Sequence, residues 1–254
     1  MPPNAARPLD GISPGADQPF PLPLIGRQSE LAVLSARLEA GRAGAGSTTL
    51  IAGEGGVGKS RLVSAVGERA RAQGWSVALG RAYPVETGVP FALFADALTP
   101  ILRALTPSAL AVLTRGDAAT LASVCPAFGV GAPPAAARDT GGDAKARLLW
   151  SFSQFLAQLA AQRPLLLVLE NLHWADASSL ELLHFVARQI VGHPIALLGT
   201  YNDSAKDASP ALRATEQSLL SVGAATSIHL EPLGVGALHE LVREVFRADD
   251  ASAR

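Results

Sequence analysis

A glycine-rich stretch at residues 53–60 constrains this chain more than any other feature. It reads Gly-Glu-Gly-Gly-Val-Gly-Lys-Ser and follows the pattern G-x-x-x-x-G-K-[ST]. A β-branched and apolar run at 48–52 precedes it, and residues 61–72 after it carry apolar side chains at helical spacing. A loop of this kind between a strand and a helix predicts a phosphate-binding site, because the backbone N–H groups and the helix N-terminus can surround an anion.

The residues of this loop have separate expected roles. The Lys59 ammonium is expected to reach the β- and γ-phosphates of a nucleotide, and the Ser60 hydroxyl to ligate Mg²⁺. Arg61 comes next and lies either near the phosphates or toward solvent. The candidate nucleotide contacts here are therefore Gly53, Gly55, Gly56, Val57, Gly58, Lys59, Ser60 and Arg61.

Composition narrows the class of protein. The 254 residues can build one large domain or two small ones, and an apolar content of 48% is ample for a core. The net charge of −1 and the scattered basic residues argue against direct DNA binding by this segment. The single cysteine, Cys125, excludes an internal disulfide and fits a reducing compartment. Without a secretory signal or a membrane-length apolar run, we expect a cytoplasmic protein without membrane contact.

The hydrophobic pattern predicts strands that alternate with helices. Residues 1–23 are rich in proline, glycine and alanine and are expected to form a disordered leader. The expected strands are 48–52, 75–79, 165–169, 195–201 and 227–230. The expected helices are 28–43, 61–72, 91–105, 108–114, 144–162, 178–191, 210–220 and 233–247, with a surface loop at 130–142. This alternation predicts a parallel, doubly wound sheet.

One strand ends in an acid, as a phosphate loop requires of its partner strand. The run 165–169 is continuously apolar and is followed by Glu170 and Asn171. We expect the Glu170 carboxylate to lie on the Mg²⁺ side of the site. Asp176 directly precedes a predicted helix, and we expect it to cap that helix. His173 and Trp174 between them are expected to be structural.

Several segments together resemble one family. These are Ile25-Gly26-Arg27, the loop at 53–60, Leu-His-Trp-Ala-Asp at 172–176, Gly199-Thr200-Tyr201 and Glu231-Pro232-Leu233. In this order and at these separations they resemble the AAA-type ATPase domain of signal-transduction (STAND-like) ATPases. That class includes large ATP-binding LuxR-type transcriptional regulators, MalT-like activators and the ATPase modules attached to some adenylate cyclases and kinases. The excess of arginine over lysine and the abundant alanine indicate a bacterial gene. The resemblance covers about residues 24–247.

The resemblance implies a fold and a domain organisation. The fold is a P-loop NTPase three-layer α/β sandwich with a five-stranded parallel sheet, a helical insertion and the start of a C-terminal helical lid. The ATPase core is expected at 24–232, with a mostly helical insertion at 84–145. The truncated beginning of the lid is expected at 233–254.

The resemblance also assigns roles to site residues. Ile25, Gly26 and Arg27 would lie near the adenine base, and Ser60 and Glu170 would hold Mg²⁺. Asn171 stands where the family usually has a second acid, and an amide is not basic at neutral pH. It either positions a water or simply forms a turn.

Two further residues lie at the end of the strand at 195–201. Thr200 or Asn202 either senses the γ-phosphate or is an ordinary strand-end polar residue. Asn202 stands where the family often has Arg.

The expected function is an ATP-binding regulatory switch with Mg²⁺, forming the N-terminal ATPase module of a transcriptional regulator. Because Asn171 replaces a carboxylate, hydrolysis is expected to be slow or negligible. The alternatives are an ATPase module of an adenylate cyclase or kinase, an actively hydrolysing ATPase, and a scaffold that keeps the loop as a relic. The expected partners are ATP and ADP, together with self-association or the other domains of a longer protein.

Overall fold

The chain forms an α/β fold in a computed structural model that describes residues 24–129, 142–206 and 209–252. The expected leader at 1–23, and all but the last residue of the expected loop at 130–142, lie outside these residues. The strands are β1 (Ser47–Gly53), β2 (Ser76–Arg81), β3 (Leu165–Glu170), β4 (Ile195–Thr200) and β5 (Thr226–Leu230). The longer helices are α1 (Gln28–Arg42), α2 (Lys59–Ala72), α3 (Ala92–Ala104), α4 (Pro107–Thr114), α6 (Gly142–Gln162), α7 (Ala177–Gln189), α9 (Pro210–Ser221) and α10 (Val235–Ser252). The short helices are η1 (Pro84–Glu86), α5 (Ala118–Leu121), η2 (Pro126–Gly129), η3 (Leu172–Trp174) and α8 (Asp203–Lys206).

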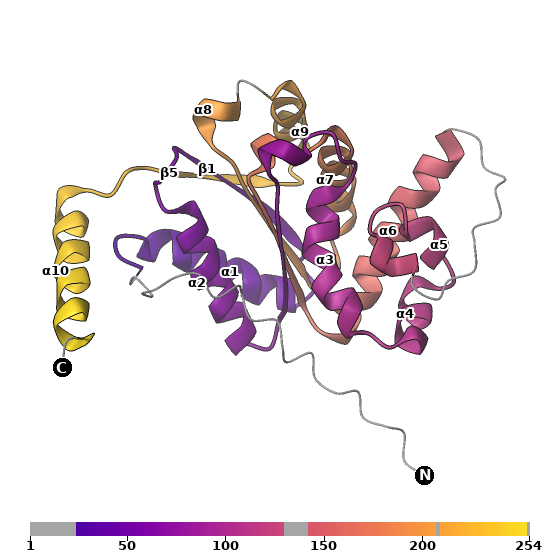
Figure 1. The fold of residues 1–254 in the computed structure, drawn as a ribbon, viewed down its shortest axis with the longest axis horizontal. Helices are drawn as coiled ribbons and strands as arrows, with labels where there is room; N and C mark the ends of the chain where they lie inside the picture. Colours follow the sequence, from indigo (N-terminus) through magenta and orange to yellow (C-terminus); the bar gives the residue numbers. More distant parts are fainter. Residues whose placement is uncertain (1–23, 130–141, 207–208, 253–254) are drawn as a thin grey trace, which may run out of the picture.

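The five strands form one parallel sheet in the order β2-β3-β4-β1-β5 (Figure 1). Ile51 on β1 is paired with Thr200 on β4, and Arg81 on β2 is paired with Glu170 on β3. Because all strands point the same way, the loops after β1, β3 and β4 meet at one edge of the sheet. Ligands of open α/β folds bind at this carboxyl edge.

Helices cover both faces of the sheet and make three layers (Figure 1). One hydrophobic cluster joins α1 and α2 to one face and includes Leu34, Leu62 and Trp75. A larger cluster joins α3, α6 and α7 to the other face, where Phe94 meets Phe152 edge-to-face at 5.3 Å between ring centroids. Every residue of β3 is buried, which explains why this strand carries an uninterrupted apolar run. The predicted P-loop NTPase sandwich is therefore confirmed.

The observed elements lie within a few residues of the predicted ones. Two differences have clear causes. Phe91, expected to begin a helix, stands before α3 with φ of 60°, and its N–H donates to the Asp176 carboxylate at 3.2 Å. β2 runs on to Arg81 because its backbone stays paired with β3 up to Glu170. The predicted capping role of Asp176 is confirmed, since its carboxylate accepts from Ser179 N at 2.9 Å.

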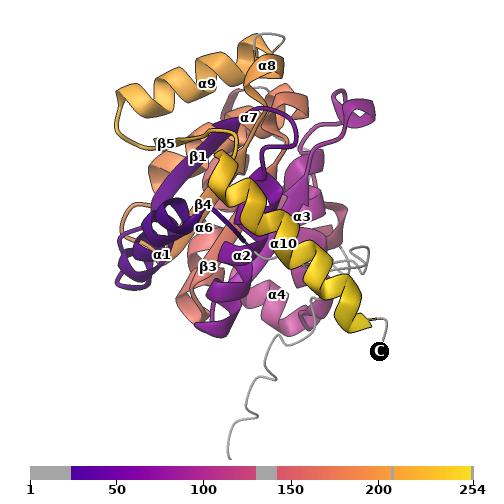
Figure 2. The ribbon, with the colours of Figure 1, turned by 90° about the vertical axis from the view of Figure 1, so that its left-hand side faces the viewer.

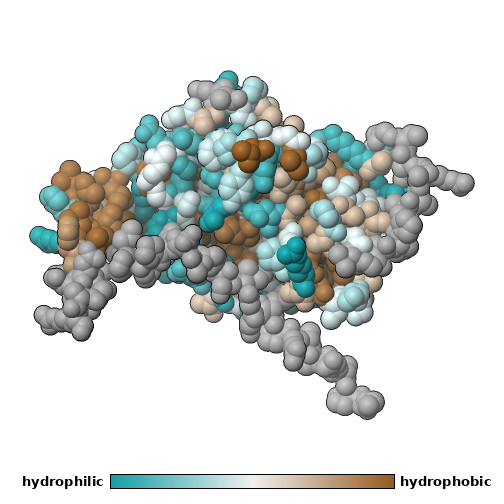
Figure 3. Space-filling model, viewed as in Figure 1, coloured by the Kyte–Doolittle hydropathy of each residue, from teal (hydrophilic) through white to brown (hydrophobic). Residues whose placement is uncertain are grey.

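Helix α10 stands apart from the layers. Figure 1 draws it to the left of the sheet, and Figure 2, seen from that side, draws it in front of α2. Its apolar side chains Val235, Leu238, Val242 and Phe246 are exposed, which gives the brown surface over this helix in Figure 3. Its first turns approach the N-terminal segment, because a Cβ on Gly26 would lie 2.8 Å from the Ala237 Cβ.

No helix in the described part of the chain combines the length and apolarity that crossing a bilayer would require.

Candidate nucleotide-binding site

The loop at 53–60 has the backbone form that its glycines predict. Gly53 has φ of 149°, and a Cβ on it would lie 2.8 Å from the Leu230 carbonyl oxygen of β5. Gly58 has φ of 102° and stands directly before α2. Both conformations disfavour a side chain. The loop therefore turns back onto the N-terminus of α2, whose unpaired N–H groups and dipole attract an anion.

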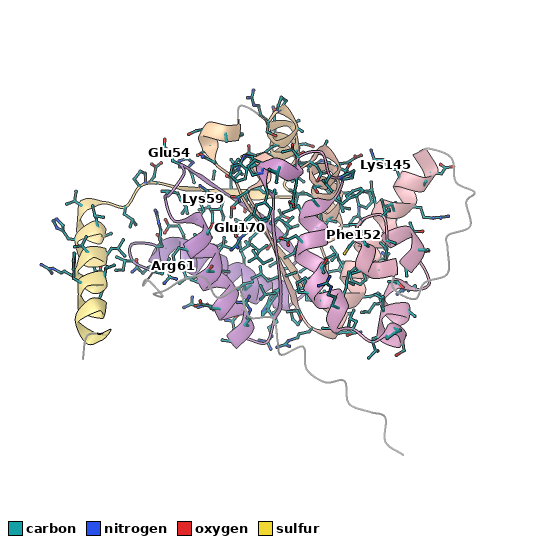
Figure 4. The ribbon with its side chains drawn as sticks, in the orientation of Figure 1. Glu54, Lys59, Arg61, Lys145, Phe152 and Glu170 are labelled. Atoms are coloured by element: carbon teal, nitrogen blue, oxygen red, sulfur yellow. The ribbon has the colours of Figure 1, made fainter. Side chains whose placement is uncertain are left out.

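Lys59 is folded back onto the loop. Its ammonium donates to the carbonyl oxygens of Gly53 at 2.8 Å and Glu54 at 2.7 Å. Burial lowers the pKa of Lys59, while the charge of the Asp203 carboxylate opposes that shift. Ser60 is exposed beside it. Figure 4 shows Lys59 and Glu170 at the same end of the sheet.

Glu170 is 3% exposed and forms an ion pair with Arg81. Arg81 Nε donates to Glu170 Oε2 at 2.7 Å, and this ion pair is the largest cause that raises the pKa of Arg81. The second carboxylate oxygen, Oε1, is buried and has no hydrogen-bond partner among the residues that the structure describes. A buried carboxylate oxygen left unpaired is costly, so it fits a role beside a cation. The Glu170 carboxylate and the exposed Ser60 hydroxyl are suitable oxygen ligands for the divalent cation that this fold class uses.

The Asn171 side chain is an amide bonded to a backbone carbonyl oxygen, and it cannot act as a base. It has φ of 63°, a left-handed conformation that Asn tolerates better than most residues. Its side-chain amide donates to the Ala82 carbonyl oxygen at 3.4 Å, and its backbone N–H donates to Thr200 Oγ1 at 3.3 Å. Thr200 is 1% exposed. Asn171 and Thr200 thus join the ends of β2, β3 and β4.

Asn202 lies against the phosphate loop. Its side-chain nitrogen is 3.6 Å from the position of a Cβ on Gly55. Its side-chain oxygen accepts from Ser204 N at 3.1 Å, and its backbone N–H donates to His173 Nδ1 at 3.2 Å. His173, expected to be structural, therefore ties the loop after β3 to the loop after β4. Burial, and then the charge of Lys59, lower the pKa of His173.

Arg27 connects three parts of the chain. It is 5% exposed, and its Nη2 donates to the carbonyl oxygens of Val57 at 2.9 Å and Glu231 at 2.6 Å. Its Nη1 pairs with Glu30 at 3.2 Å. These bonds place the Ile25-Gly26-Arg27 segment beside the phosphate loop and the end of β5. Ile25 is buried.

Arg61 lies further along α2 than Lys59 (Figure 4). It is half-buried, and its Nε has no hydrogen-bond partner within the described ranges of the chain.

Comparison with known proteins identifies the family. The family described as "AAA ATPase domain" matches residues 23–198. The chain belongs to this family. It is thus a nucleotide-binding ATPase module, which confirms the AAA-type ATPase domain that the sequence resembles. No curated protein matches the chain.

Solved structures similar to this AAA domain include ORC and Cdc6 proteins. The Aeropyrum pernix ORC1 protein in complex with DNA is 17% identical, with 90% of this chain and 50% of that chain covered and a TM-score of 0.45. Cdc6p from Pyrobaculum aerophilum is 15% identical, with 85% and 48% covered and a TM-score of 0.45. A Drosophila ORC structure bound to DNA is 13% identical, with 81% and 90% covered and a TM-score of 0.43. The AAA domain described here spans about half the length of the first two chains.

Most of the candidate residues of this AAA domain meet at the carboxyl edge of the sheet. Asn171, which directly follows Glu170, is bonded there to Thr200, whereas Lys59 is bonded to the carbonyl oxygens of the loop and Asn202 lies against Gly55. Sequence reasoning missed Arg81. The sequence signal for Arg81 is weak, because it is only a charged residue at the end of a predicted strand. Its pairing with Glu170 can be inferred only when the strand order is known.

Proposed function

We propose that this chain binds Mg-ATP as a regulatory switch and hydrolyses it slowly. The observation that carries this proposal is the contrast between Glu170 and Asn171. Glu170 presents a buried carboxylate oxygen that no described residue hydrogen-bonds, whereas the Asn171 amide is bonded to the Ala82 carbonyl oxygen. The site therefore has groups for a metal and phosphates, but the residue in the usual place of a second acid is not a base.

The binding roles follow from chemistry. The loop N–H groups and the N-terminus of α2 hold the phosphates, and Lys59 leaves the carbonyl oxygens of Gly53 and Glu54 for the β- and γ-phosphates. Ser60 and Glu170 hold Mg²⁺, which would neutralise phosphate charge when bound. We expect Asn202, which lies beside Gly55, to hydrogen-bond the γ-phosphate.

The base would lie at the N-terminal segment. Arg27 donates hydrogen bonds to the carbonyl oxygens of Val57 and Glu231, so the segment that we expect beside the base lies next to the phosphate loop. Gly26 is exposed there, its neighbour Ile25 is buried, and Ala237 of α10 lies against Gly26. Adenine, as the resemblance implies, is the base that we expect.

The finer biological role rests on the sequence motifs. We propose the N-terminal module of a STAND-like transcriptional regulator, with an ATPase core at 24–232, an insertion at 84–145 and the first part of a lid at 233–254. The exposed apolar side of α10 favours a partner that covers this helix, such as further domains or a second copy of the chain. An ATPase module of an adenylate cyclase or kinase is the alternative within the same class.

Two measurements test the proposal. In a titration with labelled ATP and Mg²⁺, the wild type should bind, and Lys59→Ala should weaken binding by about a hundredfold or more, because a phosphate-facing cation is lost. Arg71→Ala, on the same helix, is the matched control and should bind like the wild type. Steady-state turnover then separates a switch from an active ATPase. Absence of binding by folded wild type would refute the proposal.

A further inference from the structure

A buried carboxylate stands on the core-facing side of α9. Leu212, Glu216 and Leu219 share one face of this helix, because they follow one another at helical spacing. Both leucines are buried, and Glu216 between them is 6% exposed. A charge in such a place costs free energy unless it is paired, and an apolar residue would often serve stability equally well. The partners of Glu216 therefore decide what this carboxylate does.

Glu216 holds both ends of the segment 201–206, which follows β4 and contains α8. The Tyr201 hydroxyl donates to Glu216 Oε1, and the Lys206 ammonium pairs with Glu216 Oε2. Burial, followed by the hydrogen bond to Glu216, raises the pKa of Tyr201, so the phenol keeps its proton and acts as the donor. The Lys206 ammonium also lies 5.5 Å from the centre of the Tyr201 ring, within cation–π distance. One carboxylate thus joins the start and the end of this segment to α9.

Asn202 is the second residue of the segment, and the bonds within it fix the orientation of its amide. The Asn202 carbonyl oxygen accepts from Ala205 N at 3.2 Å and from Lys206 N at 3.0 Å. The side-chain oxygen accepts from Ser204 N at 3.1 Å. The side-chain nitrogen lies 3.6 Å from the position that a Cβ on Gly55 would take. Asn202 therefore turns a hydrogen-bond donor toward the phosphate loop.

Helix α9 supports this segment, because α8 has little packing of its own. The apolar side of α9 belongs to the same hydrophobic cluster as α7. By contrast, α8 has four residues, and none of them is buried. Polar contacts hold it instead: Lys206 pairs with the buried Glu216, and Asp203 lies 3.0 Å from His229 of β5, which is about half exposed. The position of α8 thus depends on Glu216.

We propose that Glu216 is a positioning residue for the nucleotide site, which holds Asn202 against the phosphate loop and so favours triphosphate over diphosphate. This inference rests on the proposed function, in which the Asn202 amide hydrogen-bonds the γ-phosphate. Glu216 acts through Tyr201, Lys206 and the backbone between them. A diphosphate has no phosphoryl group for Asn202 to bind, so loss of Glu216 lowers the affinity for ATP and leaves that for ADP.

The test is Glu216→Gln, which keeps the shape and an oxygen for the Tyr201 hydroxyl but removes the charge that pairs with Lys206. Dissociation constants for Mg-ATP and Mg-ADP are measured by calorimetry. We expect ATP to bind about three- to tenfold more weakly, which is part of the value of one hydrogen bond to a charged group, and ADP to change by less than about twofold. Tyr201→Phe removes the other bond of Glu216, keeps the ring, and should shift the ATP-to-ADP ratio in the same direction.

A double variant separates positioning from general destabilisation. Asn202→Ala removes the donor and should weaken ATP binding by about tenfold or more. Because Glu216 acts through Asn202, adding Glu216→Gln to Asn202→Ala should not shift the ATP-to-ADP ratio further. Glu181→Gln is the matched control, since it also removes a carboxylate that pairs with a lysine of another helix. It should leave both dissociation constants unchanged.

The outcomes separate the inference from the proposed function. A folded wild type that binds neither nucleotide refutes the proposed function. A wild type that binds both, with an unchanged ATP-to-ADP ratio in Glu216→Gln and Tyr201→Phe, refutes the inference alone. A further shift of the ratio when Glu216→Gln is added to Asn202→Ala also refutes it. Loss of the folded state in both single variants would assign Glu216 to stability and would overturn the inference as well.

Discussion

Arg81 Nε donates to Glu170 Oε2 at 2.7 Å, across paired positions of β2 and β3. The two residues are far apart in sequence and become neighbours only in the sheet. Arg81 is about half exposed, whereas Glu170 is almost fully buried. Arg81 therefore neutralises a carboxylate whose burial without a cation would be costly. The pair also makes the end of β2 part of the proposed metal site.

Removal of this cation should destabilise the chain. Arg81→Gln leaves Glu170 buried beside a neutral amide, and we expect the free energy of unfolding to fall by about 1–3 kcal/mol. This is below the cost of a fully buried pair, because water reaches Arg81. Lys145→Gln is the control, since Lys145 pairs with Glu181 at 2.7 Å with both side chains exposed (Figure 4). It should cost less than about 1 kcal/mol. Urea unfolding measures the free energy of unfolding of both variants. Equal losses would show that the Arg81–Glu170 pair stabilises the chain no more than an exposed pair does.

The first glycine of the loop should not accept a side chain. Gly53→Ala places a Cβ 2.8 Å from the Leu230 carbonyl oxygen at φ of 149°. We expect a loss of about 2 kcal/mol or more in the free energy of unfolding. Gly67→Ala is the opposite case, because Gly67 lies inside α2 and the nearest atom to its Cβ would be 3.6 Å away. It should stabilise by about 0.5–1 kcal/mol. Thermal unfolding of both variants gives the comparison, and a tolerated Gly53→Ala would show that β5 yields at this point.

His173 should titrate at lower pH than a free histidine. Its Nδ1 accepts from Asn202 N–H, and burial followed by the Lys59 charge lowers its pKa. A lowered folded-state pKa means that the unfolded chain takes up this proton first. The contribution of His173 to stability is therefore present above about pH 6.5 and is lost as the pH falls through the folded pKa.

Proton NMR titration of the imidazole and unfolding between about pH 7 and pH 5 measure this effect. His173→Gln should lose less stability on acidification than the wild type. Lys59→Met should raise the pKa of His173, since it removes the second cause of the shift. An unchanged pKa in Lys59→Met would show that the two side chains do not interact.

Asn171→Asp should increase ATP hydrolysis. A carboxylate at this position can accept a proton, which the amide cannot, so we expect turnover to rise by at least about tenfold. The new carboxylate would also meet the Ala82 carbonyl oxygen, to which the amide now donates at 3.4 Å, and this repulsion should turn it away from β2. Asn171→Ala serves as the control, with turnover no higher than the wild type. Fast hydrolysis by the wild type without a gain in Asn171→Asp would contradict slow turnover.

Local patterns were enough to predict the loop and the elements around it. The octet at 53–60, the apolar run at 165–169 and the Asp176 cap depend on neighbours within a few residues, so spacing alone reveals them. The parallel sandwich follows from the alternation of strands and helices. Arg27 was expected beside the base, and the structure adds that it holds Val57 and Glu231 together.

The sequence by itself determined that the chain builds a phosphate loop on an α/β sheet, because backbone conformation and hydrophobic period are local properties of the residues. Only the tertiary structure decided that β2 lies beside β3, and hence that Arg81 neutralises Glu170. It also decided that Asn202, which follows β4, lies against Gly55 of the loop. Strand order arises from long-range packing of similar apolar strands, and no short pattern encodes which two charged ends will meet.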